Sequence, residues 1–214
     1  MLTIQEISSL AIFIPLIIAG FKLKTGETKL HLFFAFLLFG AIVDSLGYFA
    51  FKSNRVWDVH AYFLTVYLIL EAYFFLWIGT FFLSKAISRS LRIIIGLLFL
   101  CLFIIKFSGE YIQDSVIYPS HFSMAYLVII SFIIGYSLLK LSEQYTQLLS
   151  FSWFWILSGI FLYSFGTFFI DALLYSKISP HIWFIRNYIN IIQYVFFVIG
   201  LSHYRREKDY TNSN

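Results

Sequence analysis

The stretch Trp153–Arg206 reads WFWILSGIFLYSFGTFFIDALLYSKISPHIWFIRNYINIIQYVFFVIGLSHYRR, in which two long apolar runs flank a polar break at Ser176–His181. Each run is long enough to cross a bilayer, which takes about 20 residues. Asp171 lies seven residues before Ile178, the middle of the break, and Arg186 lies eight residues after it. A tight hairpin would therefore place both charges at one depth. Because a lone charge in lipid is costly, we expect Asp171 and Arg186 to pair.

The composition of the chain is that of a membrane protein. Charged residues make up 12% and hydrophobic residues 60%, whereas soluble domains carry about 25% charged residues. Aromatic residues reach 22%, which suits lipid-facing and interfacial positions. The basic residues are scattered at the ends of apolar runs rather than gathered in one patch, so we expect no nucleic-acid partner. The N-terminus lacks a basic segment and carries Glu6, unlike a cleavable signal peptide.

Seven apolar runs predict an all-α, polytopic bundle of seven transmembrane helices. We expect one membrane domain, 1–204, and a short tail, 205–214. The fourth run has only thirteen uncharged residues, Ile93–Ile105, and spans a bilayer only if its flanking basic side chains extend to the surface. Pro15 is expected to kink the first run. The expected spans are about 4–21, 30–51, 57–83, 91–106, 120–139, 149–175 and 182–202.

Lysine and arginine predict the orientation, because cytoplasmic loops are enriched in both. With seven spans, four basic residues lie at span ends on the same side of the membrane as the N-terminus, or five if Arg186 is counted. Ten fall at the ends shared with the C-terminus: Lys22, Lys24, Lys29, Lys85, Arg89, Arg92, Lys140, Arg205, Arg206 and Lys208. We therefore expect an N-terminus outside, a cytoplasmic C-terminus, and a multi-pass location in a bacterial inner membrane.

Four of the expected helices carry a polar face, because positions three, four and seven residues apart share one side of a helix. These faces lie mostly in the outer half of the bundle and predict an outward-facing ligand pocket. An alternative is that the polar residues only hold the helices together by hydrogen bonds. The predicted lining residues are Asp44, Tyr67, Glu71, Thr167, Asp171, Arg186, Asn187, Asn190 and Gln193.

Several classes of membrane protein do not fit these residues. A retinal protein needs a lysine in its last span, but none lies between Lys177 and Lys208. A transporter often shows inverted repeats, and the chain has none. The single cysteine and the absence of HxxxH or HExxH pairs lead us to expect no metal and no cofactor. The inner half of the last run, Val195–Leu201, is apolar, so the pocket is expected to close inward.

The segments FWILSGIFLYSFGTFF and WFIRNYINIIQYVFFVIG resemble the last two spans of a bacterial seven-helix membrane module, found fused to sensor histidine kinases or alone. The resemblance covers about a quarter of the chain and implies a non-enzymatic sensor of a small amphiphilic ligand. No kinase follows Arg206 here, so signalling would pass through a separate partner, such as a histidine kinase or another membrane signalling protein. The matching residues are Trp155, Ser158, Gly159, Tyr163, Gly166, Asn187, Asn190 and Gly200.

A second resemblance is to the lysoplasmalogenase family of membrane hydrolases. Asp44 in FGAIVDSLGYF and Asp171 in FGTFFIDALLYS are similar in setting to two aspartates of that family, and Gln193 to a glutamine. The alternative this implies is an intramembrane lipid hydrolase with Asp44 and Asp171 as catalytic residues. The chain departs from the family, which has Gly-Asp, Ser-Asp and usually eight spans. Pairing with Arg186 would also keep Asp171 ionised, which opposes acid–base catalysis. The non-enzymatic interpretation is therefore favoured.

The orientation predicts the outcome of a reporter fusion. A reporter that is active only in the cytoplasm should be active when fused after Asn214, whereas a reporter active only in the periplasm should be silent. Measuring both activities in cells tests the prediction, and an active periplasmic fusion would reverse the orientation.

Overall fold

The computed structural model describes residues 3–25, 27–52, 57–110, 121–174 and 183–204. These residues form helices and short connections, and they contain no strand. Seven helical segments are long and apolar enough to cross a membrane, which confirms the expected all-α fold. The orientation of the bundle remains a prediction. The predicted tail, 205–214, and the polar break, 176–181, lie outside the described residues.

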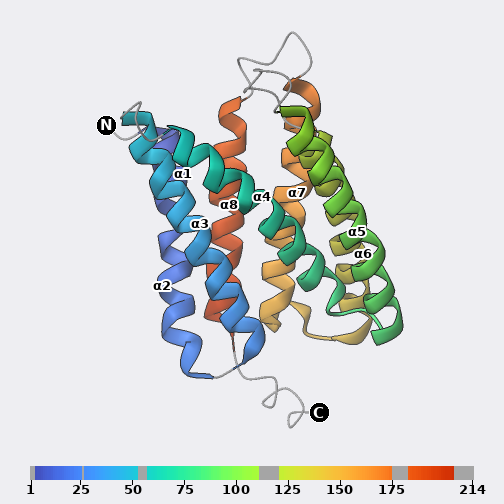
Figure 1. Ribbon diagram of the computed structural model, residues 1–214. Helices are drawn as coiled ribbons and strands as arrows, with labels where there is room; N and C mark the ends of the chain where they lie inside the picture. The colour runs from blue at the N-terminus through green and yellow to red at the C-terminus, as the bar shows by residue number, and fades with distance from the viewer. Residues whose placement is uncertain (1–2, 26, 53–56, 111–120, 175–182, 205–214) are drawn as a thin grey trace.

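α1 and α2 run in the same direction as one span, and the successive spans alternate up and down the bundle, so α1 begins at one end and α8 finishes at the other (Figure 1). α7 packs between α6 and α8, and α8 packs in turn against α1 and α2. α4 packs against α3, α5 and α6. The elements are α1 (Ile4–Ala11), α2 (Phe13–Lys22), η1 (Leu23–Thr25), α3 (Thr28–Lys52), α4 (Trp57–Thr80), α5 (Lys85–Glu110), α6 (His121–Gln144), η3 (Leu148–Ser150), α7 (Ser152–Leu174) and α8 (Trp183–Ser202).

The first span is two helices, with the break at Ile12 between α1 and α2. The cause is Pro15, which has no backbone N–H to donate to the carbonyl of Ala11, four residues earlier. The expected kink near Pro15 is therefore present as an interruption of the helix. The break leaves Ile12 only 2% exposed, pointing into the bundle.

The fourth span is longer than its apolar run, since α5 starts at Lys85 and runs for 26 residues. The helix extends beyond the expected span, 91–106, at both ends. Basic residues do not stop the helix, because their long side chains reach from an apolar stem to the surface. Arg92 illustrates this at the α4–α5 corner: its Nε donates to Thr80 Oγ1 at 2.7 Å and its Nη2 to the Trp77 carbonyl at 3.2 Å. The same contacts accompany the end of α4 at Thr80, three residues before the expected Leu83.

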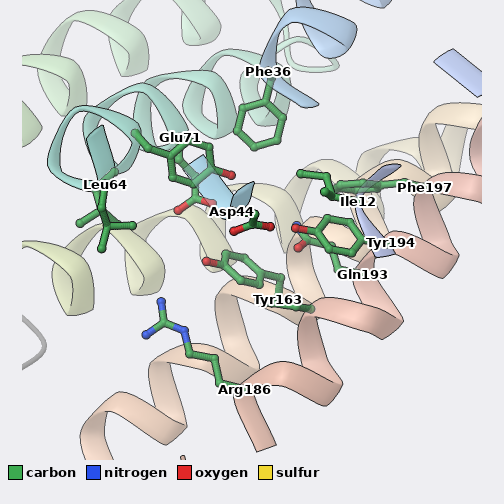
Figure 2. A pocket seen from close by; sticks show the side chains of 13 residues that line it. Ile12, Phe36, Asp44, Leu64, Glu71, Tyr163, Arg186, Gln193, Tyr194 and Phe197 are labelled. Carbon is green, nitrogen blue, oxygen red and sulfur yellow. The ribbon is translucent and has the colours of Figure 1, made fainter. Parts of the chain in front are cut away.

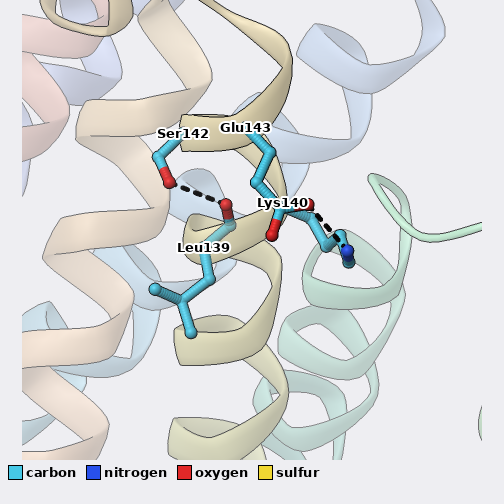
Figure 3. Close-up of polar contacts among 4 residues, drawn as sticks. All are labelled: Leu139, Lys140, Ser142 and Glu143. Atoms are coloured by element: carbon cyan, nitrogen blue, oxygen red, sulfur yellow. Dashed lines mark hydrogen bonds and ion pairs between the residues drawn. The ribbon is translucent and has the colours of Figure 1, made fainter.

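α6 also runs past its predicted end, from Leu139 to Gln144. In the added turn Lys140 Nζ lies 2.7 Å from Glu143 Oε2, and Ser142 Oγ donates to the Leu139 carbonyl at 2.7 Å (Figure 3). Both charged side chains are exposed, at 37% and 62%. The helix can therefore leave the apolar region without burying a charge.

Glycines bring α7 and α8 unusually close together. A Cβ added to Gly200 would lie 2.8 Å from the Ser152 carbonyl oxygen and 2.8 Å from Ile156 Cγ1. A Cβ added to Gly159 would lie 2.9 Å from Phe196 Cβ and 3.2 Å from the Gln193 carbonyl oxygen. Small residues allow this approach between membrane helices, where van der Waals packing drives association.

The end of the bundle at which α8 finishes is rich in basic residues, and we call it the basic end. Tyr204, just after α8, donates its hydroxyl to Glu27 Oε2, and its carbonyl accepts from Lys22 Nζ at 3.4 Å. The Tyr204 ring also packs edge-on against Trp153 of α7. The described basic residues at this end are Lys22, Lys24, Lys29, Lys85, Arg89, Arg92 and Lys140.

The close approach of α7 and α8 predicts that Gly200→Ala destabilises the protein. The new methyl group would meet the Ser152 carbonyl, which is backbone and cannot move aside cheaply, and overpacking typically costs about 1–3 kcal/mol. Thermal unfolding in detergent should show a midpoint several degrees below wild type. Gly20→Ala is the control, since its Cβ would meet only Phe34 Cε2 at 3.4 Å. Equal midpoints for both variants would contradict this account.

Candidate functional site

A cavity of about 120 Å³ lies inside the bundle, between α3 and α4 on one side and α7 and α8 on the other. We call it the central cavity. Its lining runs from Leu64 and Arg186, toward the end at which α8 begins, to Phe36 and Phe197, toward the basic end. Its lining residues are Ile12, Phe36, Asp44, Leu64, Tyr67, Leu68, Glu71, Tyr163, Arg186, Asn190, Gln193, Tyr194 and Phe197.

Glu71 is the deepest charge of the cavity and is held by tyrosines. Its side chain comes from the middle of α4 and is 3% exposed. Tyr126 of α6 donates its hydroxyl to Glu71 Oε2 at 2.6 Å, and the hydroxyls of Tyr67 and Tyr163 lie near the same carboxylate. A buried carboxylate needs such donors, because its desolvation is costly. The hydrogen bond between Glu71 and Tyr126 therefore links α4 to α6, and the Glu71 carboxylate is already occupied by hydrogen-bond donors of the protein.

Asp44 differs from Glu71 because its carboxylate is not held by hydrogen-bond donors of the described residues. It lies on α3, is half-buried, and its carboxylate sits at the centre of the cavity between Glu71 and the pair Gln193 and Tyr194 (Figure 2). Within the part of the chain that the structure describes, no hydrogen bond or ion pair holds this carboxylate. Asp44 is thus the charged group of the cavity that is most available to a ligand.

Arg186 and Asp171 form the ion pair that the sequence predicts. Arg186 Nη1 lies 3.5 Å from Asp171 Oδ1, joining the beginning of α8 to the end of α7. The Asp171 side chain is 1% exposed, whereas that of Arg186 is 26% exposed. Arg186 also lies near Glu71 and the Tyr163 hydroxyl, so its guanidinium reaches the cavity wall (Figure 2). Asp171 lies behind Arg186 and does not line the cavity.

The polar face of α7 is buried apart from the cavity. Ser164, Thr167 and Asp171 are each 0% exposed. Among the described residues, the hydroxyls of Ser164 and Thr167 have no hydrogen-bond partner, and Asp171 has only the ion pair. An unsatisfied buried polar group costs about 1–3 kcal/mol, so this face is a costly feature of the bundle interior.

The structure brings together most of the predicted pocket. Asp44, Tyr67, Glu71, Arg186, Asn190 and Gln193 line the central cavity. Thr167, Asp171 and Asn187 do not. Thr167 and Asp171 are instead buried on the polar face of α7, outside the cavity. Asn187 is half-buried beside Arg186 on α8. The alternative catalytic pair, Asp44 and Asp171, is therefore not gathered in one cavity.

Apart from Tyr67, the tyrosines at and behind the cavity are missing from the predicted pocket. Tyr163 and Tyr194 line the cavity, and Tyr126 holds Glu71 from behind. A usable signal existed for Tyr163, which lies four residues before Thr167 and so shares the polar face of α7. No comparable signal marks Tyr126, because its importance depends on how α4 and α6 pack.

The described residues bring no group of three histidine, cysteine, aspartate or glutamate side chains together as a candidate metal site. Comparisons with protein-family models, with curated proteins and with solved structures find no match for this chain. The family resemblances of the last hairpin and of the two aspartates therefore remain predictions. The chemistry of the cavity has to be argued from its own residues.

The Asp171–Arg186 pair predicts a coupled double-mutant cycle. Asp171→Leu and Arg186→Leu should each destabilise the protein by up to about 3–5 kcal/mol, because each leaves the other charge unpaired in the bundle. The double Leu variant should recover part of the loss, giving a coupling energy of about 1–3 kcal/mol in unfolding experiments in detergent. Strict additivity of the two single losses would show that the two charges do not interact.

Proposed function

We propose that this protein is a non-enzymatic sensor or regulatory module of the membrane that binds a small amphiphilic ligand in the central cavity. The observation that carries the proposal is the Asp44 carboxylate, which lies at the centre of the cavity with no hydrogen bond or ion pair to the described residues. The other charges of the cavity, Glu71 and Arg186, are bound by Tyr126 and Asp171. A carboxylate in this setting gains most from a ligand that brings a hydrogen-bond donor or a positive charge.

The size and walls of the cavity support a small ligand with both polar and apolar parts. Its 120 Å³ is the liquid volume of about four water molecules, at about 30 Å³ each. The rings of Phe36, Tyr67 and Phe197 provide apolar contact beside the polar groups of Asn190 and Gln193. Such mixed walls are typical of sites that bury an apolar body and fix its orientation with a few polar contacts.

The position of the cavity suits a ligand that enters from the lipid. Leu64 lines the cavity and is also 40% exposed, so the wall at this point of α4 is one side chain thick. Leu64 lies seven residues after Trp57, the first residue of α4, or about 10 Å along the helix. An amphiphile dissolved in the adjacent leaflet would reach this depth without crossing the bilayer.

Binding at Asp44 would add a contact across the cavity to the direct packing of these helices, such as that of Phe33 of α3 against Phe197 of α8. Asp44 lies on α3, Glu71 is fixed to α6, and Arg186 is fixed to α7. A ligand that touches Asp44 and the wall of α8 would favour one spacing of these helices over others, which is the basis of a population shift. We expect a separate membrane signalling protein, such as a histidine kinase, to respond to that shift.

The lipid hydrolase remains the second candidate, and the geometry favours it less. Two catalytic carboxylates must reach one water molecule and one substrate. Asp44 lines the cavity, but Asp171 is paired with Arg186 outside the lining. An assay of the purified protein with lysophospholipids and their vinyl ether analogues separates the two functions: turnover abolished by both Asp44→Asn and Asp171→Asn would establish the hydrolase.

The sensor proposal predicts a bound small molecule that depends on Asp44. Native mass spectrometry of protein purified in several mild detergents should show an added mass on wild type that Asp44→Asn largely loses. Glu143→Gln is the matched control, because it makes the same chemical change on the exposed turn of α6 at the basic end (Figure 3). An empty wild-type protein in every detergent, or equal retention by Asp44→Asn, would refute the proposal.

A further inference from the structure

A second cavity lies at the basic end, at the corner where α4 gives way to α5. It has a volume of about 510 Å³ and shares no lining residue with the central cavity. We call it the corner groove. Its lining residues are Phe81, Leu83, Lys85, Ser88, Arg89, Arg92 and Ile93.

Three cations and no acidic residue line the corner groove. Lys85, Arg89 and Arg92 are four and three residues apart, so they share one face of α5. Lys85 and Arg89 are exposed, and neither has an ion-pair partner among the described residues. Arg92 is fixed in place by its hydrogen bonds to Thr80 and the Trp77 carbonyl. The groove therefore presents concentrated positive charge that the protein itself does not neutralise.

Ser88 adds a polar group that points to a ligand. It is 7% exposed and lines the groove between the cations. Its backbone N–H donates to the Ser84 carbonyl at 2.9 Å, but its hydroxyl has no partner in the described residues. The first turn of α5 also presents the positive end of the helix dipole at this point, which favours an anion.

The groove has an apolar side that continues into the membrane region. Phe81 is 37% exposed and Ile93 is 56% exposed, and both line it. Beyond Ile93 the outer face of α5 stays apolar and exposed at Ile94 and Leu97, within a helix long enough to span a membrane. A molecule in the groove would thus meet cations at its head and hydrocarbon contacts along its body.

We propose that the corner groove binds the phosphate-bearing head group of an anionic phospholipid, with its acyl chains along the outer face of α5. The phosphate oxygens accept hydrogen bonds from Arg89, Lys85 and the Ser88 hydroxyl, and arginine suits this role because its planar guanidinium matches phosphate geometry. Free phosphate shares the anionic chemistry of the head group but gains nothing from Ile93, Ile94 and Leu97.

The proposal can be tested with purified full-length protein in a mild detergent. Phosphatidylglycerol, phosphatidylcholine and inorganic phosphate are each titrated, and retained lipid is measured by native mass spectrometry alongside the thermal midpoint. Wild type should bind phosphatidylglycerol and be stabilised by it, with little response to phosphatidylcholine. Stabilisation by inorganic phosphate as strong as that by phosphatidylglycerol would overturn the lipid assignment.

Matched variants separate a built site from general charge attraction. Lys85→Gln with Arg89→Gln removes two cations from the groove and should weaken phosphatidylglycerol binding about 30-fold, at about 1 kcal/mol per basic residue. Lys24→Gln with Lys140→Gln removes the same charge from the basic end outside the groove and should leave binding nearly unchanged. Equal losses in both double variants would overturn the proposal.

Ser88→Ala provides a test without a change of charge. Loss of one hydrogen bond to an ionised phosphate should weaken phosphatidylglycerol binding about tenfold. The variant should fold normally, because the Ser88 backbone bond to Ser84 is retained. Wild-type binding by Ser88→Ala would show that the lipid is held only at the exposed cations and not in the groove.

Discussion

The hydrocarbon of a bilayer supplies neither hydrogen bonds nor strong solvation, and the interior of this bundle is organised by that constraint. Arg186 and Asp171 turn toward one another, and Glu71 turns toward Tyr126. The outward positions are filled by large apolar side chains, such as Phe21 at 79% and Phe132 at 76% exposure. Polar groups are thereby concentrated where four helices meet, and the central cavity lies there.

Two kinds of helix packing place the cavity between them. On one side α7 and α8 approach closely, with Gly159 and Gly200 leaving no room for a side chain. On the other side α3 and α4 are held by stacked rings, with Phe36 and Phe74 at 4.3 Å between centroids and 8° between planes. Each pair is well packed within itself. The polar space between the pairs is the part of the interior that a ligand can fill without disturbing either one.

The sequence predicted what depends on local spacing along one helix or hairpin. The Asp171–Arg186 pair followed from two nearly equal distances to Ile178, and the inward position of Glu71 followed from the period of a helix and the cost of its charge. The seven spans followed from apolar length, although the helix that contains the fourth, Lys85–Glu110, extends beyond the expected 91–106.

What the sequence could not predict depends on packing between helices that are distant along the chain. Thr167 shares a helical face with Tyr163, yet only Tyr163 reaches the cavity. Tyr126 matters because α6 packs behind α4, and periodicity within α6 does not reveal this. Ile12 lines the central cavity because the break between α1 and α2, three residues before Pro15, turns its side chain inward.

The contacts of Tyr204 give α8 a mechanical role. The helix is 20 residues long, or about 30 Å, with Arg186 near its start and the Tyr204 anchor just past its end. That anchor joins it to Lys22 of α2, to Glu27 just before α3, and to Trp153 of α7. Because α8 is continuous between these two points, a displacement near Arg186 would reach the Tyr204 anchor, where α2, α3 and α7 adjoin it.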